Sequence, residues 1–175
     1  WKGQEKFIES LNILIEDYNV NNFQAIILGS DQGRKVYSKK LINLVQRYSL
    51  NKKVKFIQHC KEMPLAYSLA DVVVSTSVEP EAFGRVSVES QSMGKPIIAS
   101  NIGGSKETVI NKKTGFLYQY DDPRELAKIL NTVMELDPVS LQIMGNEGRK
   151  NITKKFDVES MCDSTLREYK KLLNI

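Results

Sequence analysis

Residues 75–89 read Ser-Thr-Ser-Val-Glu-Pro-Glu-Ala-Phe-Gly-Arg-Val-Ser-Val-Glu, and this stretch decides the fold. It follows residues 71–75, a short apolar run that is typical of a buried strand in a parallel sheet. It leads into a segment in which apolar residues recur at helical spacing. In open α/β sheets, ligands bind in loops at the carboxyl ends of the strands. The stretch therefore predicts an α/β fold with a binding loop.

Short apolar runs that are rich in β-branched residues recur on both sides of this stretch. Longer segments of helical period separate them, and the alternation predicts a Rossmann-like, three-layer α/β/α domain. Helices would cover both faces of one parallel sheet. The predicted strands are residues 24–28, 54–58, 71–75, 96–100 and 115–118.

After residue 118 the pattern is wholly helical. Pro123, which follows two acids, predicts one helix start, Pro138 predicts a second, and residues 158–173 form a third helical segment. We expect residues 1–155 to form the domain and residues 156–175 to form a terminal helix that packs on it or on another domain. The sequence opens on Trp1-Lys2-Gly3 and reads as a piece of a longer protein.

Composition excludes several classes of protein. The 175 residues include 25 Lys and Arg against 21 Asp and Glu, a formal charge of +4, which is too mild to indicate a nucleic-acid binder. With 41% hydrophobic residues the chain can bury a core, so disorder is not expected. The longest apolar stretches are far too short to span a membrane.

The cysteine and histidine content argues against a structural zinc site. Cys60 and Cys162 lie far apart, and His59 is the single histidine. Two unpaired thiols fit a reducing compartment, so we expect a cytoplasmic protein. Its mild positive charge is compatible with peripheral contact at the inner face of a membrane.

Two acids bracket the predicted binding loop. Glu81 should precede the helix, and Glu89 should lie on it. Between them, Phe83, Gly84 and Arg85 present backbone N–H groups at the helix start, where phosphate or a developing anion is stabilised. The acids could accept hydrogen bonds from sugar hydroxyls, or Glu81 could cap the helix while Glu89 is a solvated surface residue. Spacing alone leaves both open.

A second glycine-containing loop follows the next predicted strand. Gly103 and Gly104 suggest either a turn that a phosphate can approach or a tight left-handed turn. Neither this loop nor the one after Gly29 contains the Rossmann dinucleotide fingerprint, which disfavours a nicotinamide or flavin enzyme.

Taken in order, these blocks closely resemble the carboxyl-terminal domain of family 4 retaining glycosyltransferases (glycosyl transferases group 1), which have the GT-B fold. The resemblance as a whole extends to about Tyr169. The matching blocks are Trp1-Lys-Gly, the strand ending at Gly29, Val54-Lys-Phe-Ile, Ala70-Asp-Val-Val-Val-Ser, the Glu81-x7-Glu89 segment, Gly94-Lys-Pro-Ile-Ile-Ala-Ser, Gly103-Gly-Ser-Lys-Glu and Thr114-Gly-Phe-Leu.

The resemblance implies a role for each matched residue. Lys2 would contact the donor diphosphate, Glu81 would bind the donor hexose at the reacting centre, and Glu89 would bind the ribose. The amides of Phe83, Gly84 and Arg85 would meet the sugar and phosphates. No metal or other cofactor is implied beyond a UDP- or GDP-sugar donor. The residues expected near the base are Gln58, His59, Met63 and Leu65.

The sequence departs from the family pattern in four ways. A glycine that is common after the Val54-Lys-Phe strand is replaced near Gln58 and His59. The family places a strand and an arginine just before the lysine-glycine pair, and that strand would be central in the sheet. An amino-terminal domain would supply most of the site for a glycan or lipid-linked acceptor. Arg85 occupies a position often held by an aliphatic residue, and the sequence leaves its role open.

The resemblance implies transfer of a hexose to an acceptor hydroxyl, with retention, in bacterial-type glycan, lipopolysaccharide or capsule synthesis. We expect the 175 residues alone to be inactive. The alternatives are a non-catalytic nucleotide-binding or partner-binding module and a nucleotide-sugar epimerase of similar build.

Overall fold

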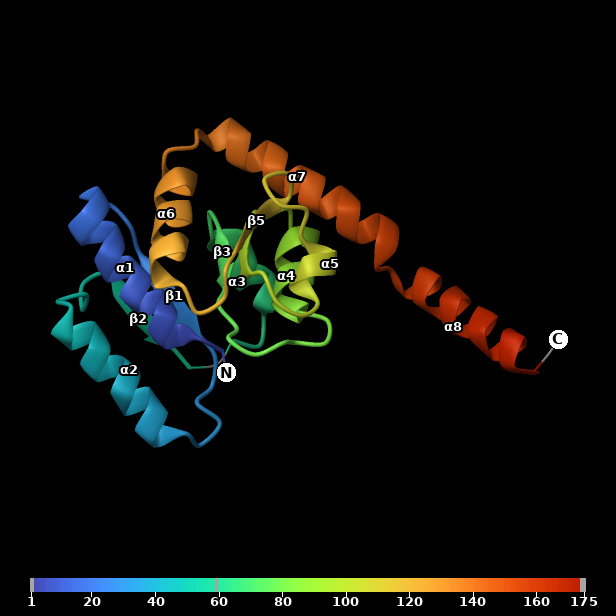
Figure 1. Cartoon of the computed structure of the whole chain (residues 1–175), viewed down its shortest axis with the longest axis horizontal. Coiled ribbons are helices and arrows are strands. Elements are labelled where there is room, and N and C mark those ends of the chain that lie inside the picture. The colour runs from blue at the N-terminus through green and yellow to red at the C-terminus, as the bar shows by residue number, and fades with distance from the viewer. Residues whose placement is uncertain (1, 59, 174–175) are drawn as a thin grey trace.

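A computed structural model describes residues 2–58 and 60–173 (Figure 1). Strands and helices alternate along the first two thirds of the chain, as predicted, and three helices follow. In chain order the elements are α1 (Gln4–Tyr18), β1 (Ala25–Leu28), α2 (Lys35–Arg47), β2 (Val54–Ile57), α3 (Met63–Leu69), β3 (Val73–Ser75), α4 (Arg85–Ser92), β4 (Ile97–Ser100), α5 (Ser105–Thr108), β5 (Gly115–Tyr118), α6 (Pro123–Met134), α7 (Pro138–Lys155) and α8 (Val158–Leu173).

All strand pairs are parallel, but the described strands form two sheets where the sequence predicts one. One sheet has the order β1-β2, with Ala25 opposite Val54, and the other has the order β3-β4-β5. In the second sheet, Ile97 lies opposite both Val73 and Gly115. Within the described residues, β1 and β3 are therefore edge strands.

A hollow of about 1800 Å³ lies against both edge strands. Residues 25–29, which include β1, and residues 72–76, which include β3, line it, together with Leu11 and Leu14 of α1 and Leu130 and Val133 of α6. The lining is mainly apolar. The two sheets are thus interrupted between β1 and β3, where the hollow lies.

Helices α1 and α6 hold the two sheets in one body. They pack on each other, and their apolar faces join a single core. The core contains Ala25 and Val54 of the first sheet together with Ile98 and Tyr118 of the second. Burial of this shared apolar surface holds the two sheets together, since no strand of one sheet pairs with a strand of the other within the described residues.

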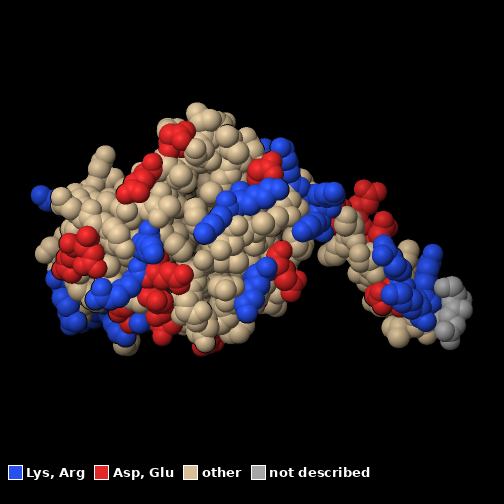
Figure 2. Space-filling view, turned by 45° about the horizontal axis from the view of Figure 1, so that its top comes forward, with Lys and Arg blue, Asp and Glu red and all other residues tan. Residues whose placement is uncertain are grey.

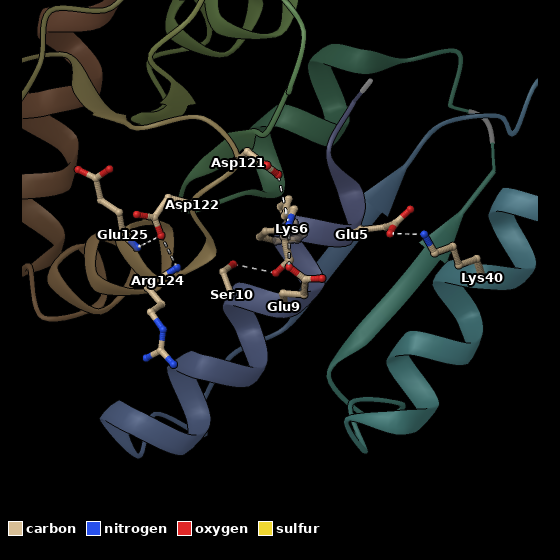
Figure 3. Close-up of polar contacts among 10 residues, drawn as sticks. Glu5, Lys6, Glu9, Ser10, Lys40, Asp121, Asp122, Arg124 and Glu125 are labelled. Atoms are coloured by element: carbon tan, nitrogen blue, oxygen red, sulfur yellow. Dashed lines mark hydrogen bonds and ion pairs between the residues drawn. The ribbon is translucent and has the colours of Figure 1, made fainter.

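Polar contacts reinforce the position of α1 (Figure 3). Lys6 Nζ lies 3.2 Å from an oxygen of Asp121, in the loop before α6, and 3.4 Å from Glu9. On the other side, Lys40 Nζ of α2 lies 2.6 Å from Glu5. Asp122 accepts hydrogen bonds from two backbone N–H groups of the first turn of α6, as an N-cap residue does.

The strands differ in burial. All four residues of β4 are buried, as expected for a central parallel strand, because β3 and β5 flank it on either side. In β2 only Val54 is buried, although the sequence predicts helices over both faces of the sheet. The reason is that β2 is paired on one side only, in a sheet of two strands.

The three carboxyl-terminal helices begin where the sequence predicts. Pro138 opens α7, and Asp137 caps it. Helix α8 contains no buried residue and extends away from the body (Figure 1). Lys, Arg, Asp and Glu side chains are interspersed over the visible face of the body and over α8 (Figure 2).

Candidate functional site

The predicted binding loop lies in a hollow of about 420 Å³ at the start of α4. Glu81 precedes the helix by four residues and Glu89 lies within it, as predicted. Seven of the ten lining residues were predicted from the sequence, namely Lys2, Met63, Glu81, Phe83, Gly84, Arg85 and Glu89. The other three are Tyr67, Ala82 and Val86.

Glu81 is held between a cation and a hydroxyl. Lys2 Nζ donates to Glu81 Oε1 at 2.9 Å, and the Ser77 hydroxyl donates to the same oxygen. The Glu81 side chain is 19% exposed, so it remains accessible from the hollow while most of it is covered. These contacts do not support the reading of Glu81 as a helix cap, because α4 shows no side-chain cap hydrogen bond.

Lys2 reaches this site from the start of the sequence, 79 residues before Glu81. Its carbonyl oxygen accepts a hydrogen bond of 2.8 Å from the Thr76 hydroxyl, one residue beyond β3. The contact fixes the backbone of Lys2 at the carboxyl end of that strand. It therefore places an ammonium group beside Glu81, where the resemblance predicts a diphosphate contact.

The second glycine loop supports the backbone of the first. Gly103 has a positive φ of 57°, and a Cβ built there would lie 2.5 Å from the Glu81 carbonyl oxygen. A Cβ on Gly104 would lie 2.6 Å from the Phe83 carbonyl oxygen. The Gly104 N–H donates to the Glu81 carbonyl at 2.8 Å. The sequence suggested either a turn that a phosphate can approach or a tight left-handed turn. Both interpretations are incomplete, because the two glycines allow this loop to lie against the backbone of the Glu81 loop.

Phe83, Gly84 and Arg85, at the start of α4, line the hollow. Gly84 adopts a left-handed conformation, with φ 73° and ψ 60°, and α4 begins at Arg85. The first amides of a helix have no acceptor within it and carry its partial positive charge. The Phe83 ring packs edge-on against Phe156, at the end of α7, with centroids 5.5 Å apart.

Glu89 is contacted on both carboxylate oxygens. Arg85 donates to Oε1 through Nη2 at 2.7 Å and Nε at 3.1 Å. The Tyr67 hydroxyl donates to Oε2 at 2.9 Å. Burial, and then the hydrogen bond to Glu89, raise the pKa of Tyr67 well above its ordinary value. Glu89 is therefore an oriented carboxylate, and the reading of it as a freely solvated surface residue is wrong.

The residues predicted near the base are only partly brought to this site. Met63 lines it and also lines the larger hollow, whereas Gln58 and Leu65 are exposed and line the larger hollow only. His59 lies outside the described residues. The base contacts of Gln58, Met63 and Leu65 stay predictions.

Sequence reasoning missed Tyr67 and Ser77. Tyr67 lies on α3 and Ser77 follows β3, and neither belongs to a recognised spacing with the residue that it contacts. The available signal was weak. An aromatic residue in a short helix beside the predicted site is more often part of the core.

Comparison with known proteins connects this geometry to a family. The sequence model of a family described as Glycosyl transferases group 1 matches residues 1–151. The chain belongs to this family. It spans less than half the length of several of its relatives.

One relative in this glycosyltransferase family is the capsular polysaccharide biosynthesis glycosyltransferase CapM of Staphylococcus aureus. It is 28% identical over 176 residues, which cover 95% of this chain and 44% of CapM. A crystal structure of Anabaena HepE in complex with UDP and glucose has a TM-score of 0.88 and 31% identity, covering 98% of this chain and 45% of that one.

Another solved structure shows which domain of a glycosyltransferase has the fold of this chain. The carboxyl-terminal domain of a group 1 glycosyltransferase, LpcC of Francisella tularensis, has a TM-score of 0.78 and 24% identity. The match covers 90% of this chain and 80% of that domain. The chain thus has the fold of the carboxyl-terminal, Rossmann-like half of a GT-B glycosyltransferase.

No helix in residues 2–58 and 60–173 combines the length and the apolar character needed to cross a membrane. In the same part of the chain, no group of three or more His, Cys, Asp and Glu side chains is arranged to hold a metal ion.

Proposed function

We propose that this chain is the donor-binding half of a retaining glycosyltransferase that transfers a hexose from a nucleoside-diphosphate sugar to an acceptor hydroxyl. One observation supports this most directly. A single hollow contains two acids, a lysine and a helix amino terminus in an order that matches hexose, diphosphate and ribose.

Each part of the donor would meet complementary chemistry. Glu81 accepts hydrogen bonds from hexose hydroxyls, and Glu89 accepts them from ribose hydroxyls. The amides of Phe83, Gly84 and Arg85 and the ammonium group of Lys2 meet the phosphates. Lys2 is paired with Glu81 at 2.9 Å, so a bound donor would place its hexose and phosphates against an acid and a cation that are already adjacent.

The reaction follows from this placement. The bond between the anomeric carbon and the diphosphate oxygen breaks, and a bond to the acceptor oxygen forms on the same face of the sugar. The acceptor proton passes to the departing phosphate oxygen. Lys2 and the amides stabilise the negative charge that develops on the diphosphate, while Glu81 aligns the hexose. The proposal requires no cofactor besides the donor.

We also propose that the acceptor is a glycan or a lipid-linked sugar, bound largely by a second domain. The capsular polysaccharide relative supports a glycan pathway. The exposed apolar residues of α8, which include Met161, Leu166 and Tyr169, support packing of this helix on another domain.

Calorimetry tests the binding part of this function. We expect the 175-residue chain to bind UDP or GDP weakly, and Glu81→Ala and Glu89→Ala to lower the affinity for the corresponding nucleotide sugar at least tenfold. Glu168→Ala, an exposed acid of α8, is the matched control and should bind as the unmodified chain does. Normal binding by both site variants would refute the assignment.

Turnover separates the enzyme from a non-catalytic nucleotide-binding module. In the full-length protein, Glu81→Ala should abolish hexose transfer while circular dichroism and thermal unfolding remain unchanged. Proton NMR of the product should report the same anomeric configuration as the donor. Tight nucleotide binding without transfer to any glycan acceptor would favour the module, and an epimerised sugar nucleotide would favour the epimerase.

A further inference from the structure

Tyr67 is a buried phenol whose hydroxyl points to the candidate site. It lies on α3, a separate element from α4, which carries Glu89, and only 6% of it is exposed. Its hydroxyl donates to Glu89 Oε2 at 2.9 Å, and Tyr67 and Glu89 both line the 420 Å³ hollow. Tyr67 is therefore the buried one of the two partners that contact this carboxylate.

The other partner is different in kind. Arg85 lies one helical turn before Glu89 on the same helix, and its side chain is 83% exposed. Exposed ion pairs at this spacing are weak and are screened by salt. We therefore attribute the orientation of Glu89 mainly to Tyr67, which is 6% exposed and whose hydrogen bond links two helices.

We propose that Tyr67 is the positioning residue that fixes the Glu89 carboxylate for the two ribose hydroxyls of the donor nucleotide. The proposal rests on the proposed function, because it requires Glu89 to bind the ribose. An ionised carboxylate offers about four acceptor positions. Tyr67 occupies one and Arg85 occupies two, so the exposed Arg85 side chain must turn away from Oε1 before Glu89 can accept both hydroxyls of a diol.

Acid–base chemistry keeps the phenol in its donating form. Burial, followed by the hydrogen bond to Glu89, raises the pKa of Tyr67. The hydroxyl therefore retains its proton at neutral and mildly alkaline pH and donates to an ionised carboxylate. A hydrogen bond to a charged acceptor is shorter and stronger than one between neutral groups, which suits a positioning role.

The position of α3 adds a second consequence. The helix begins at Met63, which lines both hollows and is one of the residues expected near the base. Tyr67 thus joins the helix of the predicted base side to the acid of the predicted ribose side. A purely structural tyrosine would hold α3 against α4 without affecting which sugar is preferred.

Discrimination between ribose and 2′-deoxyribose tests the proposal. Dissociation constants of UDP and 2′-deoxy-UDP, and of GDP and 2′-deoxy-GDP, are measured by calorimetry on the 175-residue chain. We expect the unmodified chain to bind the preferred ribonucleotide at least tenfold more tightly than its deoxy analogue. In Glu89→Ala this ratio should fall to about one.

In Tyr67→Phe the ratio should fall to threefold or less while the thermal unfolding transition remains cooperative. Tyr48→Phe is the matched control, since Tyr48 is a half-buried tyrosine at the end of α2 that packs against the main core. It should keep the full ratio. Tyr67→Met, which lacks the hydroxyl but fills similar apolar space, replaces Tyr67→Phe in the measurement if that variant does not fold.

The outcomes separate the two proposals. If the unmodified chain and Tyr67→Phe show the same preference for ribose while Glu89→Ala loses it, Glu89 binds ribose and the role of Tyr67 is refuted. If the unmodified chain shows no preference, or binds none of the four nucleotides, the ribose role of Glu89 fails, and the positioning role fails with it.

Discussion

Gly103 lies against the backbone of Glu81. A Cβ at position 103 would lie 2.5 Å from the Glu81 carbonyl oxygen and 2.7 Å from the Glu81 nitrogen. The two residues belong to loops that follow different strands. The position of the acid nearest the proposed reacting centre is thus set by a glycine that itself contacts no ligand in the proposed binding mode.

Gly103→Ala should displace the loop that carries Glu81 and weaken binding of the proposed nucleotide-sugar donor about tenfold or more. The left-handed backbone at position 103 adds a stability cost of about 1–2 kcal/mol. Gly33→Ala is the matched control, because Gly33 also has a positive φ, 81°, but a Cβ there would meet nothing within 4 Å. It should lose only the stability that the left-handed backbone costs and should keep its binding. Equal binding by both variants would contradict the role assigned to Gly103.

Removal of α8 should leave the body intact. A chain that ends at residue 157 retains Phe156 and its contact with Phe83 and loses a helix in which no residue is buried. We expect the midpoint of thermal unfolding to stay within about 2 °C, since little apolar surface changes its environment. A fall of about 5 °C or more in differential scanning calorimetry would show that α8 packs on the body.

Hydrogen exchange should distinguish the two sheets. The amides of residues 97–100 in β4 are buried between two neighbouring strands, whereas residues 55–57 of β2 are exposed. We expect peptides that cover β4 to exchange at least a hundredfold more slowly than those that cover β1 and β2. Local opening of β1 and β2 exposes less buried surface than local opening of β4 does. Uniform protection across both sheets, measured by mass spectrometry, would contradict this difference.

Stability should decrease above about pH 10. Burial raises the pKa of Tyr67 and of Tyr118 above the ordinary 10.0. Below pH 10 both groups are protonated in the folded and unfolded states and contribute no dependence on pH. Above it the unfolded chain releases protons that the folded chain keeps, so the free energy of unfolding falls as pH rises, by up to about 1.4 kcal/mol per pH unit for each group.

Urea titrations at pH 8, 9, 10 and 11 measure this decrease. Tyr118→Phe should reduce the slope above pH 10, whereas Tyr120→Phe, which removes an exposed phenol, should not. If absorbance at 295 nm shows all seven tyrosines ionising near pH 10 in the folded chain, the raised pKa values are incorrect.

Local sequence signals were sufficient to predict most of the helices and strands. Residues 115–118 form β5 at the predicted bounds, and Pro123 and Pro138 open helices, because turn residues, capping acids and apolar runs act over a few positions. The Glu81 and Glu89 pair was also found from its position between a strand and a helix. These features depend on neighbours in the chain.

The unpredicted features depend on contacts between distant segments. The Tyr67 contact with Glu89 spans 22 positions, and the support of Glu81 by Gly103 joins two separate loops. Periodicity assigns an aromatic residue to the core and a glycine to a turn, and cannot identify the carboxylate or backbone that each one meets. The division into two sheets was not predicted, since each strand taken alone looks like part of a continuous sheet.

The edges of β1 and β3 on either side of the larger hollow carry unpaired main-chain donors and acceptors within the described chain. Such edges recruit extended segments by strand addition, whichever molecule supplies them. The 175 residues by themselves should therefore self-associate as their concentration rises. Light scattering during purification will report this tendency before any assay does, and keeping the protein dilute becomes a condition for measuring its affinity for nucleotides.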